Sequence, residues 1–314
     1  MDSKFIPLLG SEIALSLYPQ LIKLVPTTIE IQVAIRCITY SILAIIGYYI
    51  TNNNTITSKN STTTKLSLTS GIVMGLVNIV HIFSSYTCFN ALSSGVGYSI
   101  FYIYPIFNLL GRTLLYNEKI NFINYIYIII AIIGVYLIYK HNKDTNTKHI
   151  LDTNIEKIEK FQNNNDILDI LNTKNTNIGI VAGIVSAFTE SIIYFMVKDN
   201  LVSVSPFIQL IKTYLFGGIL SIIYLIYNIT KNIDLDYHYW ITLILFNSII
   251  GFVGYLLRFI MIPKLSTLLF NSLIFTGVIF SYIWGYILSN EPITYSNLSG
   301  TLLILTSIFL INKK

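Results

Sequence analysis

Ten apolar runs of about 20 residues each restrict what this chain can fold into, because a helix of that length crosses about 30 Å of hydrocarbon. Inside lipid every backbone N–H and C=O group must be bonded within the protein, so only helices and closed barrels span a membrane. Barrel strands are about 10 residues long and alternate in polarity, unlike these runs. The sequence therefore predicts an all-α polytopic membrane protein. The ten expected spans are residues 5–24, 28–50, 67–90, 94–116, 122–139, 177–197, 205–228, 239–259, 265–288 and 295–312.

Composition supports the same class. Of the 314 residues, 54% are hydrophobic and only 11% are charged, and the mean hydropathy is +0.66. A soluble domain of this length needs more charge to cover its surface. The net charge of +5 is not concentrated in a basic segment, so no nucleic-acid partner is expected. The expected partners are the lipid bilayer and a small-molecule substrate, and the sequence indicates no oligomeric state.

The end of the chain repeats its middle. Residues 92–140 align without a gap with residues 265–313, and thirteen of the forty-nine positions are identical. In both copies an apolar run reaches a shared Leu-x-Asn-Glu-x-Ile turn, which contains Glu118 in one copy and Glu291 in the other. Duplicated sets of membrane-spanning helices are typical of secondary transporters. We interpret the two glutamates as turn or capping residues, because each repeat must make the same turn.

A polar segment over residues 141–176 separates five spans from five spans. It divides the chain into a first repeat at 1–140, a linker at 141–176 and a second repeat at 177–314. The linker is rich in Asn, Lys and Asp, which predicts that it is mostly disordered. The alternative is a short interfacial helix, whose apolar face would consist of Ile150, Leu151, Ile155, Ile158 and Phe161. Because each half has an odd number of spans, the halves have opposite orientations and are related by a pseudo-two-fold axis in the membrane plane. The Lys and Arg residues of the short loops favour cytoplasmic positions for both termini.

Two stretches resemble a known family. One runs from Tyr104-Pro105-Ile106-Phe107 to Leu114-Leu115-Tyr116-Asn117-Glu118-Lys119-Ile120. The other runs from Ile287-Leu288-Ser289-Asn290-Glu291-Pro292-Ile293 to Gly300-Thr301-Leu302-Leu303. They are similar to the EamA-type repeat of the drug/metabolite transporter superfamily. The resemblance implies ten helices in two inverted repeats, a central substrate cavity, alternating access, and peripheral fifth and tenth helices. The first span lacks the Trp-Gly commonly found there in that family.

Each half carries an acid in its first span and a base in its second, namely Glu12 and Arg36, then Glu190 and Lys212. A charge at the bilayer centre costs about 2.5–3.5 kcal/mol on insertion scales, so such groups usually face a cavity or a partner. Counting about 1.5 Å per residue puts Glu190 and Lys212 near one level. We expect this pair to bind a polar substrate or to take a proton. The alternatives are a structural ion pair, or bases that snorkel toward the headgroups.

Other candidates are polar groups within the spans. His81 is interpreted as a hydrogen-bonded core histidine, with a proton or substrate site as the alternative. Tyr98 and Tyr102 are four residues apart and share a helix face, where they line a cavity or simply pack. Asn271 aligns with Tyr98 across the repeat and is a second cavity-lining candidate. Arg258 lies near an expected span end and is interpreted mainly as a topology determinant, as is Arg112.

Small residues predict close helix packing at two places, Gly71-xxx-Gly75 and Gly179-xxx-Gly183. No phosphate-binding Gly-Lys-Ser/Thr loop and no His/Cys cluster with metal spacing occurs in the sequence. We therefore expect no catalytic residues, no cofactor and no metal. The expected function is gradient-coupled or exchange transport, with a proton or a counter-substrate as the second species. The alternatives are a nucleotide-sugar or phosphate-ester exchanger and a non-transporting scaffold or receptor with the same fold.

Overall fold

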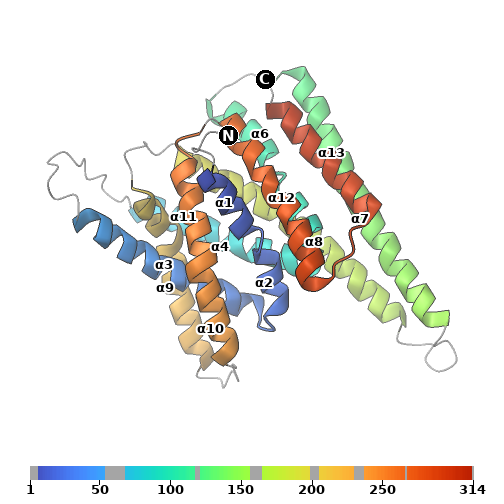
Figure 1. Cartoon of the computed structure of the whole chain (residues 1–314), viewed down its shortest axis with the longest axis horizontal. Helices are drawn as coiled ribbons and strands as arrows, with labels where there is room; N and C mark the ends of the chain where they lie inside the picture. Colours follow the sequence, from blue (N-terminus) through green and yellow to red (C-terminus); the bar gives the residue numbers. More distant parts are fainter. Residues whose placement is uncertain are drawn as a thin grey trace.

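A computed structural model shows the chain as a bundle of α-helices, with the start of α1 and the end of α13 toward the same side (Figure 1). The residues that the structure describes are 6–53, 68–116, 121–155, 165–198, 205–229, 237–265 and 267–312. The first half consists of α1 (Ile6–Leu15), α2 (Tyr18–Leu24), α3 (Ile29–Asn53), α4 (Leu68–Ala91), α5 (Ser94–Phe101), α6 (Tyr104–Tyr116) and α7 (Phe122–Ile155). The second half consists of α8 (Asn165–Lys198), α9 (Pro206–Ile229), α10 (Tyr237–Leu245), the π-helix η2 (Phe246–Gly251), α11 (Phe252–Met261), α12 (Thr267–Ser289) and α13 (Tyr295–Asn312).

In the part of the chain that the structure describes, these helices group into the ten predicted passes. Five segments of that part are long and apolar enough to cross a membrane alone: Ile29–Thr51, Thr69–Ala91, Thr176–Lys198, Pro206–Tyr227 and Tyr237–Met261. Three shorter apolar segments are Phe122–Ile138, Leu273–Ser289 and Tyr295–Leu310. The remaining two passes are broken helices, α1–α2 and α5–α6, and not the continuous spans expected over 5–24 and 94–116.

Proline explains both breaks. Pro19 and Pro105 have no N–H group, so neither can complete the hydrogen bond to the carbonyl four residues earlier, and each ring crowds the preceding turn. The chain tightens there, and Leu17 N–H bonds to Ala14 O at 3.2 Å. At the second break Ile103 N–H bonds to Ile100 O at 3.1 Å. Both breaks lie inside the bundle, where they bring irregular backbone close to polar side chains.

The burial pattern is that of a protein surrounded by lipid. On α9 the side chains of Ile222, Ile223 and Ile226 are exposed, whereas the polar Gln209 and Thr213 are buried. In water the apolar face of such a helix would point inward. The polar groups therefore face the interior of the bundle and the apolar groups face the surrounding bilayer.

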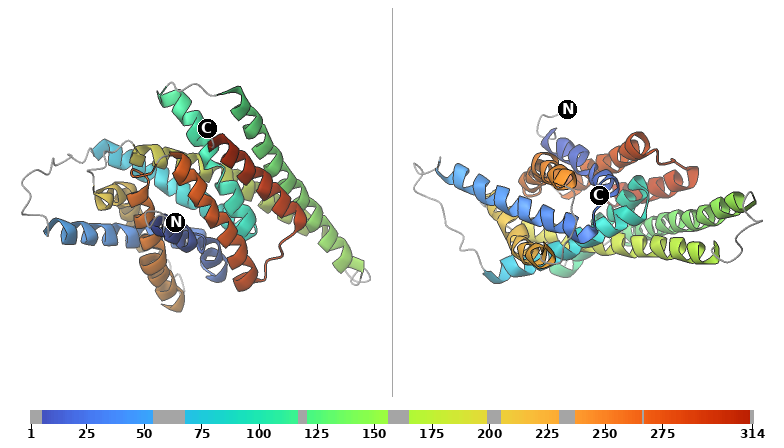
Figure 2. Two further views of the ribbon diagram at one scale, coloured as in Figure 1. Left: turned by 45° about the horizontal axis from the view of Figure 1, so that its top comes forward. Right: turned by 90° about the horizontal axis from the view of Figure 1, so that it is seen from below.

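The two halves pack around a pseudo-two-fold axis. Helix α7 packs on its counterpart α13, α3 on α9, and α5 on α12, while α4 packs on α8 and α1 on α11 (Figures 1 and 2). Where α7 meets α13, Gly134 faces Gly300, and Ser307 Oγ donates a hydrogen bond to Tyr127 O. In the repeat alignment Gly134 corresponds to Ser307, and Tyr127 corresponds to Gly300. The contact between Gly134 and Gly300 and the contact between Ser307 and Tyr127 therefore join equivalent positions of the two repeats.

The polar linker is more helical than the composition predicts. Helix α7 continues to Ile155 and α8 begins at Asn165, so helix enters residues 141–176 from both sides. The expectation of a mostly disordered linker is therefore wrong for its described part, and residues 156–164 lie outside the described residues. The reason is that the two long helices pack against each other, which supplies neighbours that the composition alone does not reveal.

The glycine motifs allow a direct test of packing. A Cβ at Gly183 would lie 2.7 Å from Ile100 Cγ2 and 2.9 Å from Cys88 Sγ, whereas one at Gly71 would meet nothing within 4 Å. We expect Gly183→Leu to lower the melting temperature of the detergent-purified protein, because overpacking costs about 1–3 kcal/mol. The matched Gly71→Leu variant should melt like the wild type. Equal melting of the two variants would contradict this packing.

Candidate functional site

A three-residue charge cluster connects the halves at the centre of the bundle. Arg258 of α11 lies between Glu12 of α1 and Glu190 of α8, and all three side chains are almost fully buried. Its Nη2 atom is 3.0 Å from Glu190 Oε1, and its Nε atom is 3.9 Å from Glu12 Oε1. We refer to Glu12, Glu190 and Arg258 as the charge triad. One guanidinium thus serves two carboxylates, one from each half.

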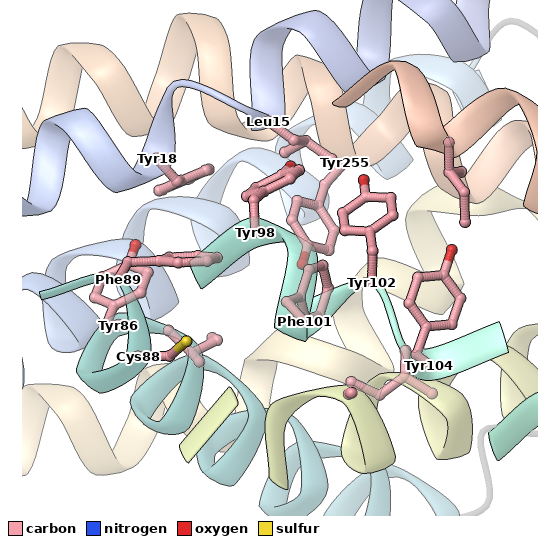
Figure 3. Packing of buried hydrophobic residues seen from close by; sticks show 14 of the residues in the cluster. Leu15, Tyr18, Tyr86, Cys88, Phe89, Tyr98, Phe101, Tyr102, Tyr104 and Tyr255 are labelled. Carbon is pink, nitrogen blue, oxygen red and sulfur yellow. The ribbon is translucent and has the colours of Figure 1, made fainter. Parts of the chain in front are cut away.

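Tyrosines and a histidine contact the charge triad, and Figure 3 shows how Tyr102 and Tyr104 lie among the buried aromatic side chains. Tyr102, in the break between α5 and α6, donates a hydrogen bond to Glu12. Tyr104 OH accepts a hydrogen bond from Arg258 Nη2 at 2.9 Å. His81 Nε2 lies 3.4 Å from Glu190 Oε2, while its Nδ1 atom is 3.2 Å from Ser186 O. The helix breaks matter here, because they set Tyr102 and Tyr104 against α1 and α11.

Hydrogen bonding in the charge triad is incomplete. Glu12 Oε1, Glu190 Oε2 and Arg258 Nε are buried atoms without a hydrogen-bond partner. The contacts of these atoms with one another and with His81 have ion-pair distances but not hydrogen-bond geometry. Buried polar atoms of this kind are normally satisfied, since an unmade bond costs about 1–3 kcal/mol. The centre is therefore suited to a polar ligand or to rearrangement.

A second buried guanidinium sits beside the charge triad. Arg36 of α3 lies within a cage of five tyrosines contributed by both halves, Tyr18, Tyr40, Tyr86, Tyr214 and Tyr255. Its guanidinium carbon is 4.5 Å from the ring centroid of Tyr18 and 4.7 Å from that of Tyr255, which are cation–π distances. Its Nη atoms donate long hydrogen bonds of 3.2 Å to Tyr214 OH and 3.4 Å to Tyr86 OH.

Arg36 and Arg258 face one small cavity. The cavity has a free volume of about 20 Å³, room for a single water molecule. Its lining residues are Leu15, Tyr18, Arg36, His81, Ser85, Phe89, Tyr98, Phe101, Tyr255 and Arg258. The site is thus closed around its charges in this conformation, and a metabolite requires the helices to separate.

One end of the bundle is closed by a polar cluster. At this end, which we call the α2 end, α2, the start of α5 and the α12–α13 turn meet. Glu291 Oε2 accepts a hydrogen bond from Ser94 N–H at 2.6 Å, and Glu291 Oε1 pairs with Lys23. Asn290 makes the turn with a φ of 51°, a left-handed conformation that Asn tolerates better than most residues. The Asn290-Glu291 copy of the repeated turn thus caps the N-terminus of α5 in the other half.

A lysine also lies at the opposite end of the bundle. Lys198, the last residue of α8, donates hydrogen bonds to the backbone carbonyls of Ile262 at 3.0 Å and Leu265 at 2.6 Å. The repeat counterpart of Glu291, Glu118, lies outside the described residues.

The sequence-predicted residues are brought together only in part. Glu12, Glu190, His81 and Tyr102 converge on Arg258. Tyr98 lines the cavity and stacks on Tyr102 with ring centroids 4.8 Å apart, and Arg36 lies across the cavity. Asn271 belongs to α12, but its side chain lies outside the described part.

The expected pair of Glu190 with Lys212 is wrong. Glu190 pairs with Arg258 and His81, and Lys212 is only half-buried, with no ion pair among the described residues. Depth counted along one helix gives the level of a residue but not the direction in which it faces, so it cannot select a partner.

The role expected for Arg258 is also wrong. The sequence places it near the end of a span, which suggested a topology determinant, yet it is 2% exposed and central to the charge triad. Its partners come from the first span of each half, and their carboxylates reach Arg258 only in the folded bundle. The available signal was electrostatic, since two intramembrane acids require a buried base.

The charge triad predicts a strong dependence on charge balance. Arg258→Met should lower the free energy of unfolding by about 3–5 kcal/mol, because it strands two buried carboxylates. Adding Glu12→Gln and Glu190→Gln to that variant should recover much of the loss. Thermal melting in detergent measures both effects, and Arg112→Met is the control for losing a half-buried arginine. A triple variant no more stable than Arg258→Met would show that the charges do not compensate one another.

Comparison with known proteins agrees with this architecture. The EamA-like transporter family matches residues 5–140 and again residues 177–313. No curated protein matches the chain. A crystal structure with 11% sequence identity superposes with a TM-score of 0.59 over 99% of this chain and 97% of the other, which shows that the fold is shared. The chain therefore belongs to the EamA-like transporter family and is a multi-pass membrane transporter of the drug/metabolite transporter superfamily.

Proposed function

We propose that the protein is a secondary transporter that moves a small polar metabolite by alternating access, with the charge triad as its switching centre. The observation that carries the proposal is the position of Arg258, which contacts a carboxylate of each inverted repeat inside the membrane. A change in the angle between the repeats must change the two distances. The equilibrium between conformations is then sensitive to anything that binds at the centre.

The charge count supports coupling to a second species. When either Glu12 or Glu190 leaves Arg258, its carboxylate needs a proton or a cationic group, because a bare charge is expensive inside a membrane. His81 lies beside Glu190 and offers a neighbouring proton carrier. Gradient coupling and exchange both follow from this arrangement, since either a proton or a counter-substrate replaces the lost ion pair.

Alternating access also requires a closed side. The Lys23–Glu291 pair, together with Ser94, connects α2, α5 and the α12–α13 turn, so it joins both repeats at the α2 end. The loop charges support cytoplasmic termini, which would put the α2 end on the far side of the membrane. In this proposal the cluster closes that side while the site is shut.

Flux in proteoliposomes tests the proposal. Purified protein is reconstituted with an internal pH indicator and offered amino acids, nucleosides, nucleotide-sugars and sugar phosphates. We expect at least one class to enter and to carry proton movement with it. Glu190→Gln should abolish the proton movement while leaving exchange of labelled substrate measurable, and Glu30→Gln, an exposed acid at the start of α3, should behave like the wild type.

Two outcomes contradict the proposal. A folded protein that binds a compound but moves none of it favours the non-transporting scaffold. Proton movement that is unchanged in Glu190→Gln removes the carboxylate from the coupling step.

The cluster at the α2 end predicts a separate effect on access. Glu291→Gln removes the Lys23 ion pair and weakens the cap on α5, so the α2 end should open more often. In a background without Cys37 and Cys88, a cysteine introduced at the cavity residue Ser85 reports the opening. Its rate of alkylation by a small maleimide should rise several-fold with Glu291→Gln. Glu30→Gln is the control, and an unchanged rate would mean that the cluster does not limit access.

A further inference from the structure

One buried charge beside the cavity has no direct ion-pair partner among the described residues. Glu12 and Glu190 are both committed to Arg258, and among the described residues no carboxylate lies within ion-pair distance of Arg36. Arg36 is nevertheless only 3% exposed. An arginine does not lose its proton inside a protein, so this positive charge persists. The surplus carboxylate of the charge triad balances Arg36 in number, but no carboxylate among the described residues contacts it.

We propose that Arg36 and its tyrosine cage form an anion-binding subsite, and that the transported metabolite carries a small oxyanion, preferably a single carboxylate. This inference deepens the proposed function and rests on it. A buried charge is costly unless it is paired and hydrogen-bonded. The four tyrosine rings within cation–π distance offset only part of that cost, because they supply partial charges and not a full negative charge.

The hydrogen bonds of Arg36 are arranged for a ligand. Its Nε atom is buried without a partner, and its two Nη bonds to Tyr86 and Tyr214 are long. A planar carboxylate can accept two parallel bonds from one guanidinium, which are shorter and stronger than bonds to a neutral phenol. The phenols that line the cage carry O–H groups, which can donate to the same oxyanion. Tyr18 OH and Tyr40 OH already contact each other at 2.5 Å, so the cage is a connected set.

The surroundings indicate the size of the anionic group. Arg258, on the other side of the cavity, is already paired with two carboxylates, and Lys212 does not line the cavity. The single guanidinium of Arg36 can pair with one carboxylate, whereas a diphosphate would be repelled by the surplus negative charge of the charge triad. The positive charge of Arg36 disfavours a purely cationic solute in the cage. The rest of an anionic metabolite extends toward His81 and Arg258, which line the cavity and of which Arg258 has an unpaired Nε atom.

Melting in the presence of small probes tests the subsite. The purified protein is titrated with formate, its neutral analogue formamide, and inorganic phosphate, because a ligand of the folded state raises the melting temperature. We expect formate to stabilise the wild type and formamide to have no effect. Arg36→Lys should weaken the formate response by about tenfold, because Lys loses the planar fork. The response should be absent in Arg36→Met and unchanged in the control Arg112→Met.

The melting of the variant without ligand distinguishes a binding role from a structural one. Arg36→Lys keeps the positive charge in the cage but removes the planar fork, so a binding role predicts a weaker formate response with a melting temperature close to that of the wild type without ligand. A much lower melting temperature would indicate a structural arginine and overturn the proposal. Equal responses to formate and formamide, or a formate response that survives Arg36→Met, would also overturn it. A melting response to phosphate but not to formate would overturn the carboxylate and indicate that the anionic group of the metabolite is a phosphate ester.

Flux separates this inference from the proposed function. In proteoliposomes, carboxylates and their amides are compared as matched pairs in wild type and Arg36→Met. Transport of carboxylates only, lost in Arg36→Met, is the expected result. If the wild type and Arg36→Met both transport a carboxylate and its amide equally, the anion-binding subsite is overturned, while the proposed transport function stands. Binding of formate that depends on Arg36, without any flux, overturns transport and leaves the subsite.

Discussion

The structure depends on one constraint, which is that a charge buried in a membrane protein must have a partner. Glu12 and Glu190 occupy the first span of each half, and lipid offers them nothing, so both must turn inward toward Arg258. That requirement brings α1, α8 and α11 together at the centre of the bundle. One base shared by two acids gives weaker ion pairs than two separate acid–base pairs. Weaker ion pairs are easier to break, which suits a transporter that must exchange one set of contacts for another.

The pseudo-two-fold axis relates the contacts between the two halves. Inverted repeats of similar sequence can adopt two conformations that are exchanged when the repeats swap roles. Where α7 packs on α13, the contacts of the two halves are reciprocal. At the α2 end Lys23 of one half pairs with Glu291 of the other, so this ion pair must change when the orientation of the repeats changes.

Much of the fold was predictable and much of the site was not. Apolar run length and the duplicated Asn-Glu turn determine the passes and their inversion, because both depend on local sequence and lipid thickness. The breaks before Pro19 and Pro105 could have been inferred from proline chemistry, but an apolar run hides them. The role of Arg258 could not be read along the chain, since its partners lie about 70 and 250 residues away in sequence.

The two buried arginines show how binding and coupling can be divided within one cavity. Arg258 already has its counter-ions, so a ligand reaches it only by displacing a carboxylate, which is a step that changes the conformation. No carboxylate among the described residues contacts Arg36, so an oxyanion can bind it without breaking any ion pair of the protein. A metabolite would then bind first at the tyrosine cage and only afterwards disturb the charge triad. In this order, substrate binding at Arg36 precedes the breaking of the ion pairs between Arg258 and the two carboxylates. The free energy of substrate binding can then offset the cost of breaking those ion pairs.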